Sequence, residues 1–227
     1  MYPLRRGGLP YTGFYLTFAS AEVAEVIYKL MMKHCNDELR KFIIAEYEGA
    51  RVESSRSWLF EIMCHGLWAS AEDDVLHDRS LMGNAQDPSF AMEIPVEVET
   101  VTFDALEDIP EFSADTAVYC RLSTKSFPSI ATIYSDKRAY HLLQMTVAKE
   151  HNIAHAPLVE ILNWYKQHKK SSQPLTFAFV VPAGMAKDYK QLQLKTGLRT
   201  VHSRPNTEAM NLTQYVVGVN IAPPATD

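Results

Sequence analysis

The chain has 227 residues, of which 47% are hydrophobic and 22% are charged, and it contains 9 Gly and 12 Pro. These values exclude a collagen-like, low-complexity or largely disordered chain. Cys35, Cys64 and Cys120 show neither CxxC nor Cys/His ligand spacing, so a disulfide framework or a structural zinc site is not expected. No apolar run reaches the roughly 18 residues that a membrane span needs. The first ten residues lack the apolar stretch of a secretory signal, so we expect a reduced, soluble, globular protein.

The charge is divided unevenly along the chain, whose formal net charge is −5. Residues 1–113 contain 9 Lys/Arg and 20 Asp/Glu, whereas residues 114–227 contain 13 and 7. A basic surface on an acidic protein can still contact phosphates. The alternative is that these cations occupy ordinary solvated helix faces.

Three helices are predicted in the first part of the chain. Ser20 can cap the first of them, because side-chain oxygens accept hydrogen bonds from the first backbone N–H groups of a helix. Residues 37–46 and 55–70 show the same apolar spacing and are the second and third helices. Residues 72–78 are acidic and are predicted to be a loop. The apolar residues that define the first helix are Val23, Val26, Ile27, Leu30 and Met31.

From residue 94 onward, alternation of apolar and polar residues predicts strands. The clearest strand is 140–148, in which Leu143 and Met145 lie on one face and Leu142 and Gln144 on the other. A helix follows from Pro157. The continuous apolar run 175–181 is typical of a strand that is buried on both faces. The remaining predicted strands are 94–100, 116–122, 129–134 and 214–221.

This order of elements predicts an α/β sandwich, in which a mixed central sheet is flanked by helices on both faces. We expect the strand 140–148 to be internal to the sheet, with 175–181 beside it. The helix 55–70 should pack against this sheet.

Two pairs of polar residues stand among apolar neighbours. Glu61 and His65 share one helix face and could bind a divalent cation or pass a proton. The alternative is an ordinary ion pair on a wet helix face. Gln144 and Thr146 point to the same side of their strand, as the polar residues of a nuclease strand do. The alternative for this second pair is a buried, hydrogen-bonded Gln and Thr.

Four segments, in order, resemble the C-terminal domain of Crinkler-type effectors, the Crinkler and retrotransposon-hot-spot-like proteins of oomycetes, fungi and other eukaryotic microbes. The resemblance extends over residues 18–189. It implies a restriction-endonuclease-like (PD-(D/E)XK) fold in residues 51–222, with residues 1–50 as an N-terminal helical extension packed on it and 223–227 as a frayed tail. The four segments are 55–65 (SRSWLFEIMCH), 125–131 (KSFPSIA), 142–151 (LLQMTVAKEH) and 177–182 (FAFVVP).

The resemblance also implies a degenerate catalytic site. Glu61 matches the family's helix glutamate, and Gln144 stands where the third core strand of such nucleases carries a ligand. The expected aspartate is replaced by Ala131, and Thr146 stands where an active nuclease has lysine. Without that aspartate, two-metal hydrolysis loses its bridging carboxylate. We therefore expect Glu61 and Gln144 to converge and to hold Mg²⁺ weakly, if the domain binds a cofactor at all.

The resemblance implies a pathogen effector that is secreted and delivered to the host cell, where it reaches the nucleus. Its delivery region is not recognised in this chain. We expect the domain to act by binding host DNA or protein, with no membrane partner and with homo-oligomer formation left open. Lys166, Lys169 and Lys170 are the expected nucleic-acid contacts. The alternatives are an active metal-dependent DNA endonuclease and a protein-interaction or dimerisation module built on the apolar helices 20–34 and 58–68.

Overall fold

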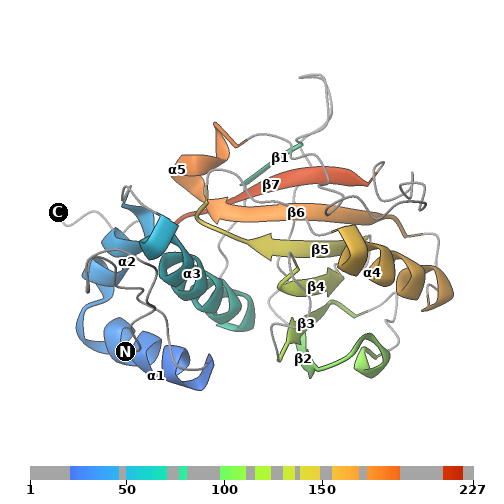
Figure 1. Cartoon of the computed structure of the whole chain (residues 1–227), viewed down its shortest axis with the longest axis horizontal. Coiled ribbons are helices and arrows are strands. Elements are labelled where there is room, and N and C mark those ends of the chain that lie inside the picture. Colours follow the sequence, from blue (N-terminus) through green and yellow to red (C-terminus); the bar gives the residue numbers. More distant parts are fainter. Residues whose placement is uncertain are drawn as a thin grey trace, which may run out of the picture.

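A mixed β-sheet forms the centre of the molecule in the computed structural model (Figure 1). The structure describes residues 21–45, 50–70, 77–80, 98–110, 116–123, 130–135, 139–148, 155–168, 173–189 and 212–221. Within these ranges the sheet has seven strands in the order β1-β7-β6-β5-β4-β3-β2. The strands are β1 (His77–Ser80), β2 (Glu99–Phe103), β3 (Val118–Leu122), β4 (Thr132–Ser135), β5 (Tyr140–Met145), β6 (Leu175–Pro182) and β7 (Thr213–Val219).

The strand directions divide the sheet into an antiparallel and a parallel part. β3, β4 and β5 follow one another as antiparallel neighbours. β5, β6 and β7 are parallel, and the chain crosses from β5 to β6 through a helix, as parallel neighbours require. At the edges, β2 is parallel to β3 and β1 is antiparallel to β7. The protein is therefore α/β with a mixed sheet.

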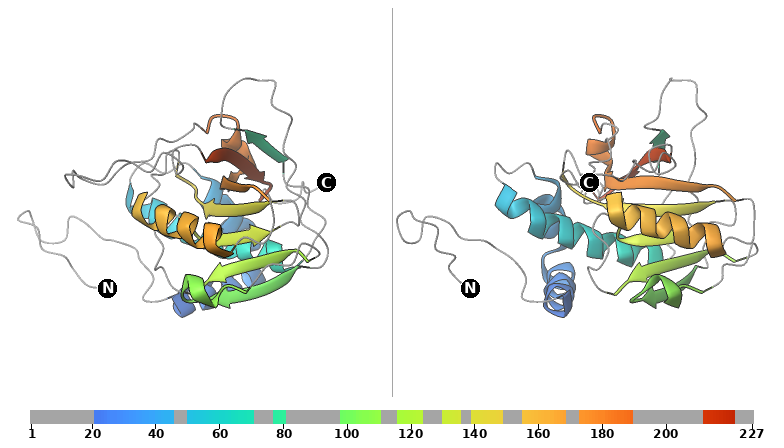
Figure 2. Two further views of the ribbon diagram at one scale, coloured as in Figure 1. Left: turned by 90° about the vertical axis from the view of Figure 1, so that its right-hand side faces the viewer. Right: turned by 45° about the vertical axis from the view of Figure 1, so that its right-hand side comes forward.

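Helices cover both faces of this sheet (Figure 2). One face is covered by α4, and the opposite face is covered by α3 with α1 and α2 beside it. Within the described ranges no helix combines the length and the apolar character needed to cross a bilayer. The helices are α1 (Ala21–His34), α2 (Asn36–Ile44), α3 (Ala50–Ser70), α4 (His155–His168) and the short α5 (Ala183–Ala186), and a 3₁₀ turn, η1, spans Leu106–Asp108.

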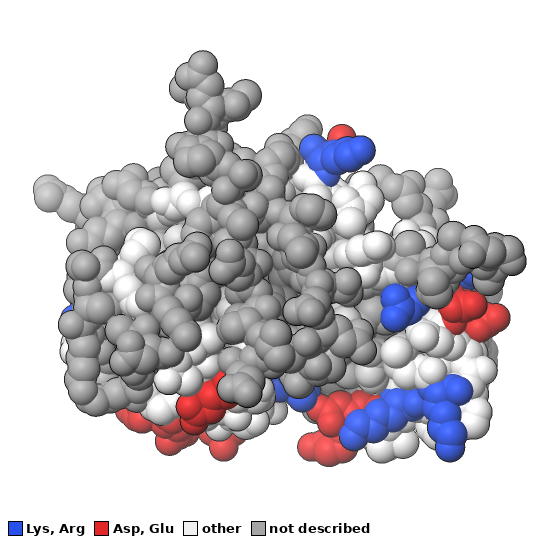
Figure 3. All heavy atoms as spheres, turned by 180° about the vertical axis from the view of Figure 1, so that it is seen from behind, with Lys and Arg blue, Asp and Glu red and all other residues white. Residues whose placement is uncertain are grey.

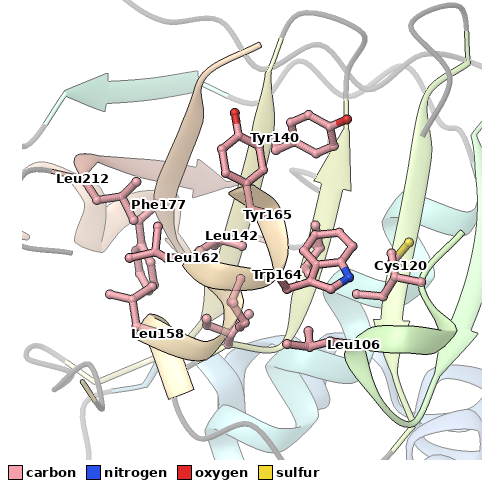
Figure 4. Close-up of a cluster of buried hydrophobic side chains, with 14 of the residues drawn as sticks. Leu106, Cys120, Tyr140, Leu142, Leu158, Leu162, Trp164, Tyr165, Phe177 and Leu212 are labelled. Atoms are coloured by element: carbon pink, nitrogen blue, oxygen red, sulfur yellow. The ribbon is translucent and has the colours of Figure 1, made fainter. Parts of the chain in front are cut away.

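Two separate cores result, one on each face. The α4-face core contains Leu142 and Phe177 from the sheet, and α4 lays Leu158, Leu162 and Trp164 over it (Figure 4). The α3-face core gathers buried residues from the sheet and from α2 and α3, including Leu39, Phe60, Trp68, Leu143, Met145 and Val180.

Strand β5 is internal, with β6 beside it, as the sequence predicts. Its alternation is also confirmed, because Leu142 belongs to the α4-face core while Leu143 and Met145 belong to the α3-face core. Every residue of β5 is buried, which follows from helices covering both faces.

Arg56 of α3 ties α2 to the rest of the fold. Its Nη2 donates to the carbonyl oxygen of Ile43 at 2.6 Å, and its Nε lies 3.1 Å from the same oxygen and 3.2 Å from that of Phe42. The last carbonyls of a helix have no partner within the helix and carry a partial negative charge. A buried guanidinium at this position therefore satisfies the end of α2 and fixes it against α3.

Several element boundaries differ from the sequence prediction. The loop predicted for residues 72–78 is wrong at its end, because His77 and Asp78 begin β1. β1 has the sequence HDRS, which shows no apolar alternation, and its strand conformation comes from pairing with the apolar β7. β2 ends at Phe103, three residues beyond the predicted strand, while residues 94–97 lie outside the described ranges. α3 begins at Ala50, five residues earlier than predicted.

Candidate functional site

A row of polar side chains runs from the exposed side of α3 into the α3-face core. The row consists of Glu61 and His65 on α3, Tyr119 on β3 and Thr132 on β4, and we call it the α3 polar network. His65 Nδ1 lies 2.6 Å from the Tyr119 hydroxyl, and Thr132 Oγ1 donates to the same hydroxyl at 3.3 Å. On the other side of the imidazole, Nε2 lies 3.7 Å from Glu61 Oε1.

Local structure explains why these residues meet. Glu61 and His65 are four residues apart, so they occupy the same face of α3. Alternation along β3 turns Tyr119 toward α3, whereas Cys120 belongs to the α4-face core. The ring of Trp68 stacks on Tyr119 at a centroid distance of 5.8 Å and holds the phenol in place.

Burial decides the protonation of the network. The pKa of His65 is lowered from its ordinary value chiefly by burial, although Glu61 acts in the opposite direction. Burial also raises the pKa of Tyr119 well above its ordinary value. At neutral pH both rings are therefore uncharged, so Glu61 and His65 do not form an ion pair. His65 is also only 6% exposed, so the alternative of an ordinary ion pair on a wet helix face is wrong.

The hydrogen bonds then assign the positions of the protons. Because the Tyr119 oxygen accepts from Thr132, the phenol proton can point to His65 Nδ1, which accepts it. The imidazole proton is left on Nε2, on the side of Glu61. A proton could pass along this row, but Tyr119 is 1% exposed and Thr132 is fully buried, so no substrate contacts the inner end. The main physical effect of the network is to fix the rotation of α3 on the sheet.

Gln144 and Thr146 emerge on the opposite face of the sheet from Glu61. Gln144 alternates with Leu143 and Met145 of the α3-face core, which places its side chain on the side of α4. Its amide donates to the carbonyl oxygen of Met145 at 3.2 Å. Thr146 is buried, and its Oγ1 accepts from the backbone N–H of Ala148 at 3.0 Å. These bonds match the alternative of a buried, hydrogen-bonded Gln and Thr.

The structure does not bring the expected metal ligands together. Glu61 belongs to α3 and Gln144 points to the α4 side, so the sheet lies between them and one ion cannot contact both. Ala131 directly precedes β4, where its N–H donates to the carbonyl oxygen of Leu143 at 2.9 Å, and its methyl group offers no ligand. These residues do not fit a Mg²⁺ site. Among the described residues, no cluster of three or more His, Cys, Asp or Glu side chains could hold a metal ion.

Only one of the three lysines expected to contact nucleic acid can be placed. Lys166 is exposed on α4, whereas Lys169 and Lys170 lie outside the described ranges. The described solvent-facing positions of α4 also include the acidic Glu160. The described part of α4 therefore carries mixed charge on its outer face.

The cysteines do not contribute a nucleophile to either core. Cys64 and Cys120 are free and buried. Burial raises the pKa of the Cys64 thiol well above its ordinary value and raises that of Cys120 to about 12. Both remain protonated at neutral pH, and a thiol in this state is a poor nucleophile.

The sequence pattern did not predict Tyr119 and Thr132, the inner half of the α3 polar network, or a second buried contact. Tyr119 lies 54 residues from His65, and no local pattern links them. On the neighbouring strands, His141 Nδ1 lies 2.7 Å from Thr176 Oγ1, and the ring of Tyr134 stacks on His141. A signal for this second contact existed, because His141 interrupts one apolar face of a predicted internal strand.

Comparison with known proteins adds no relative. No protein-family model, no curated protein and no solved structure matches the chain. The function of the chain is therefore inferred from its own residues.

Proposed function

We propose that the chain is a Crinkler-type effector domain with a restriction-endonuclease-like core that acts by binding and does not hydrolyse nucleic acid. The order of the helices and strands along the chain supports the restriction-endonuclease-like core. α3 is followed by the antiparallel strands β3, β4 and β5, then by α4, and then by β6 parallel to β5. α3 and α4 cover opposite faces of these four strands. This order of elements is similar to that of the restriction-endonuclease core. Delivery to a host cell and its nucleus rests on the sequence resemblance alone.

One observation carries the non-hydrolytic part of the proposal. Glu61 and Gln144, the two candidate ligands, lie on opposite sides of the sheet, and Ala131, which belongs to the α3-face core, supplies no carboxylate. Metal-dependent phosphodiester hydrolysis needs ligands that converge on one ion or on two adjacent ions. Glu61 instead faces His65, and the Gln144 amide is bonded to the backbone of its own strand.

The described surface favours a protein partner over nucleic acid. Val26 and Leu30 on α1 are 57% and 54% exposed, which is high for apolar side chains that lie close together. Protein surfaces that bind nucleic acid, in contrast, are dominated by clustered Lys and Arg. The outer face of α4, where the lysine contacts are predicted, carries both Glu160 and Lys166.

A cleavage assay tests the absence of hydrolysis. Purified protein is incubated with supercoiled plasmid and Mg²⁺ or Mn²⁺, beside a Glu61→Ala variant. We expect no nicking above background from either protein. Divalent-dependent nicking that Glu61→Ala abolishes would contradict the proposal and establish the alternative, an active nuclease.

A titration tests the class of partner. Duplex DNA is added to the protein at about 50 mM and 200 mM salt, with Lys166→Glu as the matched variant. Each phosphate contact releases counterions, so nucleic-acid binding falls steeply with salt. We expect no saturable binding of DNA at about 200 mM salt. Tight binding with a steep salt dependence that Lys166→Glu reduces would contradict a protein partner and support DNA.

A further inference from the structure

Among the described residues, one side of the helix α1 packs against the rest of the protein. Ala24 on this side is fully buried, and Tyr28, Met31 and Met32 pack against the α3-face core. Next to them, Glu25 forms an ion pair with Arg121 of β3, with Oε1 and Nη2 2.5 Å apart. These contacts fix which side of α1 faces the protein and which side faces outward.

The outward side of α1 carries an apolar stripe. Val23, Val26 and Leu30 are 41%, 57% and 54% exposed. They are spaced by three and four residues, so they lie on one side of the helix. We call these three residues the α1 stripe. They are three of the four large apolar residues that are most exposed in the described part of the chain, and the fourth is Ile44 on α2.

Charged residues flank the α1 stripe in an ordered way. Glu22 stands at the first turn, and Lys29 and Lys33 stand toward the end of the helix, all three exposed and along the same edge of the stripe. In Figure 3, acidic and basic side chains lie beside one another at the lower right of the molecule, where α1 and α2 are located. The edge therefore changes from acidic to basic along the helix.

We propose that the α1 stripe binds the α1 stripe of a second copy of this chain in antiparallel orientation. With a two-fold axis near Val26, Val23 of one copy packs against Leu30 of the second copy. Glu22 then lies beside Lys29 and Lys33 of the second copy, and the reciprocal contacts follow from the symmetry. In a parallel pair, the edges that carry Glu22, Lys29 and Lys33 would lie on opposite sides of the interface, so Glu22 would face neither lysine of the second copy. The antiparallel pair also opposes the two helix dipoles.

This inference rests on the proposed protein-binding function and names the partner. The interface is small, because each copy contributes the face of one 14-residue helix. Protein interfaces below about 1,200 Å² are typical of weak, reversible complexes. We therefore expect association in the micromolar range, seen as a mass that increases with protein concentration.

Sedimentation or light scattering across roughly 1 to 200 μM measures this mass. The wild-type mass should rise from that of the 25.7 kDa chain toward twice this value. Val26→Glu and Leu30→Glu each place a charge in the stripe and should weaken association by at least about tenfold. Both positions are exposed, so far-ultraviolet circular dichroism should show unchanged folding. Ile44→Glu, an equivalent change at 39% exposure outside the stripe, is the matched control and should leave the dimer intact.

Charge reversal tests the orientation. Glu22→Lys and Lys29→Glu each bring like charges together in the antiparallel pair and should weaken association about two- to fivefold. The double variant restores one opposite-charge contact while Lys33 is unchanged, so it should associate more tightly than either single variant. Lys166→Glu on α4 is the control and should have no effect. A monomeric wild type at every concentration, a double variant that fails to recover, or loss of the dimer in Ile44→Glu would overturn the inference. None of these outcomes bears on hydrolysis, which the plasmid assay measures separately.

Discussion

The two faces of the sheet are buried by side chains of different chemistry. On the α4 face, the contacts are mostly between apolar and aromatic groups, such as Leu142, Leu158 and Phe177. On the α3 face, apolar contacts surround the α3 polar network, in which His65 and Tyr119 are joined by a 2.6 Å hydrogen bond. Helices cover both faces closely, so the extent of burial is similar. The two faces differ in whether their contacts include directional hydrogen bonds.

Apolar contacts depend little on direction, whereas a buried hydrogen bond tolerates only a narrow range of angles. The apolar contacts of α4 with the sheet therefore impose few directional constraints on that helix. A rotation of α3, in contrast, would separate His65 from Tyr119 and leave buried polar atoms without partners. We infer that α4 supplies mainly stability, and that α3 also specifies how α1 and α2 are oriented through their contacts with it.

The variants with the largest expected loss of stability test whether the apolar contacts of the two faces are equivalent. Phe177 and Phe60 are both fully buried, one in each core. Phe177→Ala and Phe60→Ala should each lower the free energy of unfolding by about 3 to 5 kcal/mol, because each leaves a cavity. Urea denaturation measures this loss when the slope of the unfolding free energy against urea concentration is the same in the variant and the wild type. A difference of more than about 2 kcal/mol between the variants would contradict equivalent packing.

Removing one hydroxyl sharpens the comparison. Tyr119→Phe keeps the ring but leaves His65 Nδ1 and Thr132 Oγ1 without their shared partner, so we expect a loss of about 1 to 3 kcal/mol. The matched control on the other face is Tyr165→Phe, whose hydroxyl donates to the carbonyl of Gln173 at a partly buried position. That change should cost less, about 0.5 to 1.5 kcal/mol. Equal losses would show that the network has no special role.

The pH dependence of stability should follow His65. Its pKa is lowered in the folded state, so below the ordinary value of about 6.5 the unfolded chain binds the proton more readily. The stabilisation is therefore complete above pH 6.5 and is lost as the pH falls from there toward the folded-state pKa. Urea midpoints at pH 7.5, 6.0 and 5.0 measure this loss, with His65→Gln as the reference. If both proteins lose stability equally on acidification, His65 is not the cause.

The smallest expected effect concerns Glu61. Its carboxylate lies 3.7 Å from an uncharged imidazole and its side chain is 29% exposed, so Glu61→Gln should change stability at pH 7.5 by no more than about 0.5 kcal/mol. The glutamate favours protonated His65, so the variant should lose more stability than the wild type when the pH falls to 5.0. A loss above about 2 kcal/mol at pH 7.5 would mean that Glu61 has a structural role that the network does not explain.

The sequence predicted elements whose own pattern determines them. β5 alternates between two cores and β6 is apolar throughout, so burial on both faces could be predicted for each. The apolar spacing of α1 placed that helix within a few residues of its observed bounds. β1 could not be predicted, because its four polar residues form a strand only by pairing with β7.

The candidate site was less predictable for the same physical reason. The helical spacing of Glu61 and His65 predicted that the two would meet, but the burial of His65 depends on Tyr119, a distant residue on another strand. Alternation along β5 already placed Gln144 on the face opposite Leu143 and Met145. Which of these faces α3 would cover could not be deduced, because that choice depends on the topology of the whole chain.

The order of the strands has a consequence for synthesis of the protein. β7 lies between β1 and β6, although β1 is the first strand of the sheet along the chain and β7 is the last. Until residues 213–219 leave the ribosome, β1 has no neighbour and one edge of β6 is unpaired. That edge belongs to a strand in which Phe179 and Val180 are fully buried in the finished protein. Unpaired apolar edges recruit other chains. A nascent chain that terminates before residue 213 should therefore aggregate instead of forming a smaller folded domain.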